Sequence, residues 1–191
     1  MTPFIVGFGG TTRADSSSER LVAAILARTE GLGATTRLFG GTALAALPHF
    51  APENTIRTPE QKDFVDAVRQ ADGLVIGTPG YHGGVSGLVK NAIDLLEDTR
   101  SDARVYFDYM PVGLAVSAAG WQAGGVTLSA LRDIVHAMRG WPTPIGIAVN
   151  TIEQPMFRED GRLEASIDVM VDAQARQIMF LAQRGGYAGN T

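Results

Sequence analysis

The sequence predicts an α/β fold, in which a doubly wound, five-stranded parallel sheet carries helices on both faces. Short apolar runs alternate five times with stretches whose apolar residues have helical spacing. The central runs are apolar throughout, as expected of strands that are covered on both sides. No second hydrophobic register, internal repeat or linker interrupts the 191 residues, so we expect one domain over 1–191.

The first half of the alternation begins with an expected strand over 3–9 that ends in glycines. A helix follows over 16–28, because its apolar residues recur every three or four positions. A second strand is expected over 34–39. The segment 40–58 contains two prolines and two glycines without a sustained period, which predicts a long loop.

The second helix has the clearest start signal in the chain. Pro59 suits the first helical turn, Thr58 suits the N-cap, and Gln61 stands near the reciprocal capping position. A third, central strand over 73–77 and a helix over 86–97 follow.

The last part of the chain completes the sheet. We expect a fourth strand over 112–117, a helix over 125–139, a fifth strand over 145–149 and a closing helix over 163–184. Two connections are also expected, a polar and aromatic one over 98–109 and a rigid one over 141–144. In such sheets ligands bind outside the carboxyl ends of the strands, so the loops after strands one, three and four should hold the site.

Composition argues against several classes of protein. The chain has 16 basic and 20 acidic residues, a net charge of −4 and no basic stripe, so we expect no nucleic-acid partner. No apolar run approaches the roughly 18–20 residues that cross a bilayer, so we expect no membrane association and a cytoplasmic location. The sequence has no cysteine, which leaves any redox chemistry to a bound cofactor.

The loop after the first strand is rich in groups that bind phosphate. Its hydroxyl and guanidinium side chains are those of Thr11, Thr12, Arg13, Ser16, Ser17 and Ser18. They stand directly before a helix, whose first N–H groups and positive dipole end attract anions. The alternative is that the hydroxyls only cap the helix. A triphosphate loop would need a lysine that is missing, and a dinucleotide loop a glycine where Thr12 stands.

A second string, over 78–94 (TPGYHGGVSGLVKNAID), carries a family resemblance. It resembles the second signature of the NADPH-dependent FMN reductase family. The first loop resembles the family's phosphate loop at Gly10, Thr11, Arg13, Ser16 and Ser18. The resemblance implies a flavodoxin-like fold with strand order 2-1-3-4-5.

The resemblance also implies FMN as cofactor and NADPH or NADH as hydride donor. Its implied phosphate ligands are Thr11, Arg13, Ser16, Ser17 and Ser18. The isoalloxazine ring would be lined by Pro79, Gly80, Tyr81, His82 and Gly83, and its other edge covered by Ser117 and Gly120. Trp121 either forms a substrate wall there or fills a subunit interface.

Some residues depart from the family pattern. Gly80 stands where the family commonly has Glu, His82 where it commonly has Asn, and Ser86 replaces another frequent residue. His82 either serves as a proton donor near neutral pH or packs at the pocket edge. His49 and His136 are isolated, and no metal-ligand spacing occurs, so we expect no metal.

The function expected from these features is that of an FMN-dependent NAD(P)H oxidoreductase. Hydride would pass through FMN to a small-molecule electron acceptor, such as a flavin, a quinone, an azo or nitro compound or a specialised metabolite. A flavodoxin-like electron carrier and a non-redox module for a phosphorylated ligand remain alternatives, although Arg13 favours the reductase. The resemblance implies a homodimer or homotetramer. Segment 106–109 either contributes to its interface or packs on the core of its own chain.

Overall fold

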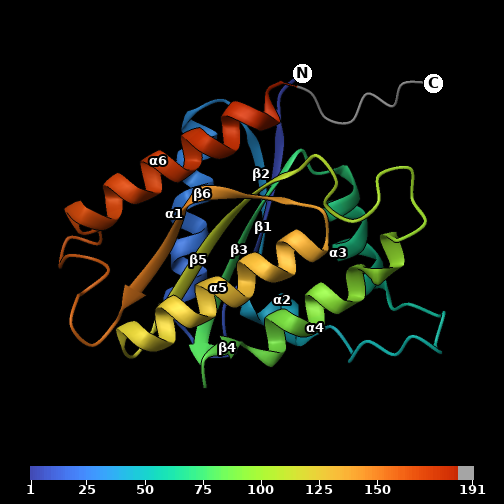
Figure 1. The fold of residues 1–191 in the computed structure, drawn as a ribbon, viewed down its shortest axis with the longest axis horizontal. Helices are drawn as coiled ribbons and strands as arrows, with labels where there is room; N and C mark the ends of the chain where they lie inside the picture. Colours follow the sequence, from blue (N-terminus) through green and yellow to red (C-terminus); the bar gives the residue numbers. More distant parts are fainter. Residues whose placement is uncertain (185–191) are drawn as a thin grey trace.

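The computed structural model describes residues 1–184 and shows a parallel sheet between two layers of helices (Figure 1). Its main strands are β1 (Phe4–Gly9), β2 (Thr35–Phe39), β3 (Gly73–Tyr81), β5 (Pro111–Ala118) and β6 (Trp141–Asn150). They lie in the order β2-β1-β3-β5-β6, and every neighbouring pair is parallel. This is the expected order 2-1-3-4-5, so the predicted fold class is confirmed.

The helices divide between the two faces of the sheet. One face carries α1 (Ser17–Gly31) and α6 (Ala165–Ala182), and the other carries α3 (Pro59–Gln70), α4 (Gly87–Leu95) and α5 (Trp121–Ala137). Apolar residues of each layer pack on the sheet, as in the edge-to-face contact of Phe8 and Phe64 at 5.3 Å. The predicted start at Pro59 is confirmed, since Thr58 and Gln61 form a capping box.

Two predicted connections contain regular structure. The predicted loop over 40–58 begins with a short helix, α2 (Gly41–Ala45), which buries Leu44 completely. The predicted rigid connection over 141–144 is the first part of β6. Because β6 is an edge strand, its two prolines can forgo the N–H donors that a central strand needs.

Several element ends also differ from the prediction, among them those of the third strand and of the third and fourth helices. The third strand extends beyond residue 77 to Tyr81, because β4 (Gly84–Val85) folds back and pairs with it. The helix expected over 86–97 ends at Leu95 and continues as a 3₁₀ turn over Leu96–Thr99. The fourth helix begins at Trp121 instead of 125, directly after Gly120, whose φ of 133° is one that glycine adopts readily.

Candidate functional site

A cavity of about 260 Å³ lies at the carboxyl edge of the sheet, where the loops after β1, β3 and β5 meet. Nine of the predicted site residues line it, namely Thr11, Arg13, Ser16, Ser17, Ser18, Pro79, Gly80, Tyr81 and Ser117. The other lining residues are Ala14, Asp15, Ala118, Ala119 and Thr151. The structure therefore brings together side chains that are up to 140 positions apart (151 − 11), because parallel strands share one carboxyl edge.

The start of α1 has an unusual arrangement of serines. Ser16 is the N-cap residue, yet its side chain makes no capping hydrogen bond. Its hydroxyl lies instead 3.2 Å from that of Ser18, and both serines are buried. The alternative that Ser16 merely caps the helix is therefore wrong. The N–H groups of the first turn thus remain available at the edge of the cavity.

Arg13 supplies the positive charge at this end of the cavity. Its backbone N–H donates to Thr11 Oγ1 at 3.2 Å, which shapes the loop. Its guanidinium is exposed and makes no hydrogen bond or ion pair with another described residue. Asp15 follows in the left-handed region, at φ 55°, which short polar residues tolerate. The guanidinium is thus free to meet an anion in the cavity.

The loop after β3 is a two-residue hairpin. Tyr81 pairs with Gly84, and the intervening His82 and Gly83 have φ values of 53° and 76°. Two positive φ values in succession are typical of a type I′ turn, and a polar residue followed by glycine between two strands is the sequence signal for it. His82 and Gly83 are at the hairpin tip and are not among the residues that line the cavity.

Gly80 departs from the family pattern for a steric reason. A Cβ atom at this position would lie 3.0 Å from Ala118 Cβ and 3.0 Å from Thr127 Oγ1. The end of β3 therefore packs tightly against β5 and α5, and a larger side chain at position 80 would require its neighbours to move by a few tenths of an ångström.

Trp121 and Gly120 lie outside the cavity lining. The Trp121 side chain is 55% exposed, and its indole N–H donates to Glu153 Oε2 at 2.7 Å. This bond joins the start of α5 to the loop after β6. In that loop, Thr151 donates to the carbonyl of Ala118 and so reaches the cavity. Sequence reasoning missed Thr151, although its place after the fifth strand was a usable signal.

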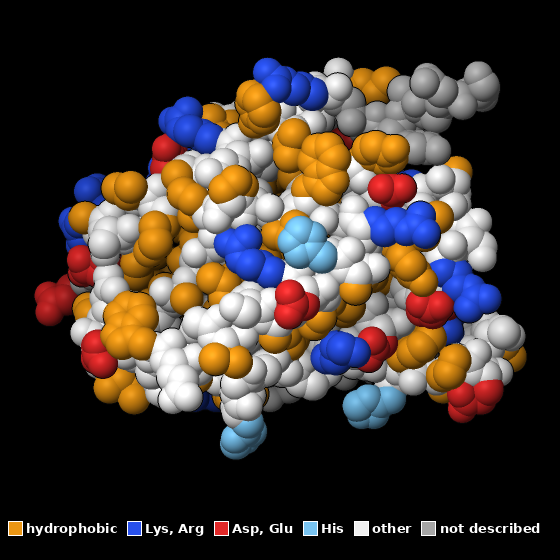
Figure 2. Space-filling model, viewed as in Figure 1, with side chains coloured by type: hydrophobic (Ala, Val, Ile, Leu, Met, Phe, Trp, Pro, Cys, Tyr) orange, Lys and Arg blue, Asp and Glu red, His pale blue; other side chains and the backbone are white. Residues whose placement is uncertain are grey.

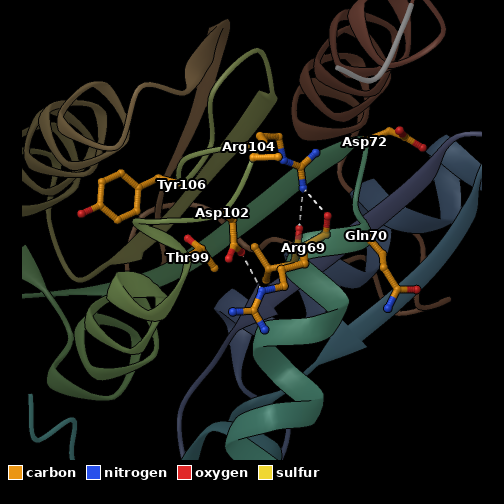
Figure 3. A pocket seen from close by; sticks show the side chains of 9 residues that line it. Arg69, Gln70, Asp72, Thr99, Asp102, Arg104 and Tyr106 are labelled. Carbon is orange, nitrogen blue, oxygen red and sulfur yellow. Dashed lines mark hydrogen bonds and ion pairs between the residues drawn. The ribbon is translucent and has the colours of Figure 1, made fainter. Parts of the chain in front are cut away.

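A larger cavity, of about 420 Å³, lies at the opposite edge of the sheet (Figure 3). There Arg104 donates to the carbonyls of Val68, Arg69 and Ala71 and so closes the end of α3. Burial lowers the pKa of Arg104, and Arg69 pairs with Asp102 at 2.7 Å. Because these charges hold the fold together, we assign the candidate site to the smaller cavity.

The chemistry of the smaller cavity suits an anion. Its donors are hydroxyls, helix N–H groups and a guanidinium. Within residues 1–184, no group of three or more His, Asp and Glu side chains is placed to hold a metal ion. No helix of this described part is both long and apolar enough to span a bilayer.

Comparisons with known proteins identify the family of the chain. The family model of the NADPH-dependent FMN reductases matches residues 3–154. An FMN-dependent NADPH-azoreductase of Staphylococcus haemolyticus (strain JCSC1435) is 35% identical over 133 residues, which are 68% of this chain and 63% of that protein. The chain thus matches less than two thirds of that relative's length.

Two solved structures share the fold. The NAD(P)H:(acceptor) oxidoreductase FerB of Paracoccus denitrificans superposes with a TM-score of 0.72 at 18% identity, over 94% of this chain and 98% of its own. A flavodoxin, a WrbA-like protein of Agrobacterium tumefaciens, gives 0.62 at 16% identity, over 97% and 100%. At such identities these structures show the flavodoxin-like fold alone.

Proposed function

Because the chain belongs to the NADPH-dependent FMN reductase family, we propose that it binds FMN at the carboxyl edge of the sheet. There it would pass hydride from NADPH or NADH to a small-molecule acceptor. One observation carries this proposal: the uncapped start of α1 opens on the same cavity as the ends of β3 and β5. An anionic group and a flat ring therefore have adjoining places in one site.

The phosphate end of the site is formed by the loop before α1. Thr11 and the three serines at 16–18 offer neutral hydroxyl donors, and the first turn of α1 offers N–H groups. Arg13 adds a charge-assisted hydrogen bond, which is about twice as strong as a neutral one. These groups would fix the position of the FMN phosphate.

The ring end is formed by Pro79, Gly80 and Tyr81 on one side and by Ser117 and its neighbours on the other. Bound FMN supplies the hydride chemistry, so the chain need only hold, orient and polarise it. Backbone N–H groups are the donors suited to the negative charge that develops on a reduced flavin.

The outer rim of the ring end would meet the second substrate. We assign His82, Gly83, Gly120 and Trp121 to this rim. Tyr81 is 52% exposed at the cavity, so its ring has one face available for a planar molecule. His82 would there be a proton donor to the acceptor, since an imidazole N–H can donate a hydrogen bond or a proton.

We also propose a homodimer that forms through the α4–α5 face. Figure 2 shows hydrophobic side chains on this face among charged and histidine side chains. A groove there is lined by Phe50, Ile93, Ile134 and Met138, which are buried or half-buried, and by the charged residues Lys90, Asp94 and Glu97. Val126 of α5 is 49% exposed, and exposed apolar side chains are typical of an interface. Sedimentation equilibrium should give twice the mass of the chain, and a monomer would contradict the dimer.

The direct test of function is a titration of FMN into the purified chain, followed by anaerobic mixing with NADPH and with NADH. We expect tight FMN binding and loss of the flavin absorbance on addition of a nicotinamide. Acceptors to screen are azo compounds, as the relative's name suggests, flavins and quinones. Failure to bind FMN would contradict the proposal. Binding without reduction by either nicotinamide would favour an electron carrier.

A cytoplasmic location, where reduced nicotinamides are supplied, is part of the proposal and is testable by cell fractionation.

A further inference from the structure

Glu19 lies in the first turn of α1, beside the proposed phosphate site, but does not line the cavity. Its Oε2 atom accepts a hydrogen bond of 2.7 Å from the backbone N–H of Gly41. The bond joins the start of α1 to the start of α2, across 22 positions of the sequence, and is partly buried. Although this carboxylate lies near the proposed anion site, its hydrogen bond to Gly41 holds it against the start of α2.

The carboxylate is closely surrounded by the backbone of glycine residues. A Cβ atom on Gly40 would lie 2.5 Å from Glu19 Oε1, and one on Gly10 would lie 2.9 Å from Oε2. A Cβ atom on Gly41 would lie 1.8 Å from the carbonyl oxygen of Thr11. The backbones at 10–11 and 40–41 are therefore in direct contact, with the carboxylate seated against both.

The contact between segments 10–11 and 40–41 reaches the phosphate loop through Thr11. The Thr11 carbonyl abuts Gly41, whereas its hydroxyl accepts from the Arg13 N–H at 3.2 Å. Thr11 and Arg13 both line the cavity. If α2 moved away from Glu19, the backbone that carries Thr11 and Arg13 would thus lose its contact with Gly41.

We propose that Glu19 is a positioning residue for the phosphate loop and acts through Gly41 and Thr11. The inference rests on the proposed function, because the ligand that the loop serves is the phosphate of FMN. It also explains the glycine at 41, because a Cβ atom there would meet the backbone carbonyl of Thr11.

The test compares the affinities of the chain, freed of flavin, for FMN and for riboflavin, which lacks the phosphate. Glu19→Ala should weaken FMN binding by about tenfold, equivalent to about 1.4 kcal/mol, and leave riboflavin binding unchanged. Glu19→Gln retains an oxygen that accepts from Gly41, so it should restore most of the FMN affinity. Gly41→Ala should reproduce the selective loss, because its Cβ would displace the Thr11 carbonyl.

Glu30→Ala is the matched control. Glu30 lies near the other end of the same helix, where its carboxylate accepts from Thr36, so FMN binding should not change. Equal losses for FMN and riboflavin, or no loss in either variant, would overturn the positioning role. Circular dichroism will show whether Glu19→Ala folds. If it does not, the loss of FMN affinity relative to riboflavin affinity in Gly41→Ala tests the positioning role instead. A wild-type chain that binds no FMN would overturn the proposed function itself, and the inference with it.

Discussion

The helices α1 and α4 both begin after a buried serine, but the two serines do different things. Ser86, before α4, accepts a hydrogen bond from the N–H of Val89 at 3.3 Å. Ser16, before α1, makes no such bond and lies beside the Ser18 hydroxyl instead. One hydroxyl completes its own helix, whereas the other leaves the helix start open toward a cavity. The difference shows that the sequence alone does not distinguish a serine that caps its helix from one that leaves the first N–H groups of the helix open.

The strongest test of this contrast is Arg13→Ala at the open helix start. We expect FMN binding to weaken by about 1.5–3 kcal/mol, the contribution of a hydrogen bond to a charged group. The melting temperature of the flavin-free protein should not change, because the guanidinium is exposed. Arg20→Ala is the control, since Arg20 stacks on Phe157 at 3.6 Å and does not line the cavity. If titration calorimetry gives the same loss of FMN affinity for both variants, the assignment of Arg13 to the phosphate site is contradicted.

Removal of the Ser16 hydroxyl should weaken FMN binding and have little effect on the stability of the fold. Ser16→Ala should weaken FMN binding by about 1.5 kcal/mol, at the lower end for a bond to a charged group. The free energy of unfolding of the flavin-free protein should fall by only about 0.5 kcal/mol, the low end for a hydrogen bond, because the bond to Ser18 is lost but no cap is removed. A larger loss in urea denaturation would mean that Ser16 stabilises α1 after all.

The capped helices should show the reverse behaviour. Thr58→Ala removes one half of the capping box on α3 and should lower the free energy of unfolding by about 1 kcal/mol. Ser86→Ala should cost about the same at α4. Neither residue lines the cavity, so the FMN affinity of both variants should equal that of the wild type. A large loss of affinity in Thr58→Ala would remove the contrast between the helix starts.

The smallest effect is expected at the hairpin before α4. His82→Asn introduces the Asn-Gly pair that type I′ turns prefer, so stability should change by only a few tenths of a kcal/mol, since both residues tolerate positive φ. As the proposed proton donor to the acceptor, His82 should be needed for the second half-reaction, so the rate of acceptor reduction should fall while FMN reduction by the nicotinamide is unchanged. An unchanged rate of acceptor reduction would remove His82 from the chemistry.

The sequence predicted those features that depend on periodicity and topology. Alternating apolar runs fix a parallel sheet, and a parallel sheet gathers the loops after its strands at one edge, so residues as distant as Ser16, Pro79 and Ser117 could be assigned to one site. The capping box at Thr58 was equally readable, because all its parts are local.

Other features depend on contacts that no local pattern encodes. The missing cap at Ser16 depends on the position of its hydroxyl beside Ser18. The bond from Gly41 to Glu19 spans 22 residues, and the steric limit at Gly80 arises from the packing of α5. The prolines before residue 145 resembled a connection, because only the assembled sheet shows that β6 is an edge strand.

The central claim is that the open start of α1 recognises a phosphate. Its most direct test is the ratio of the wild-type dissociation constants for riboflavin and for FMN, measured on the flavin-free protein by fluorescence titration. We expect FMN to bind at least about a hundredfold more tightly, or by about 2.8 kcal/mol, because only FMN carries the group that Arg13 and the helix start would hold. Equal affinities for the two flavins would contradict the claim.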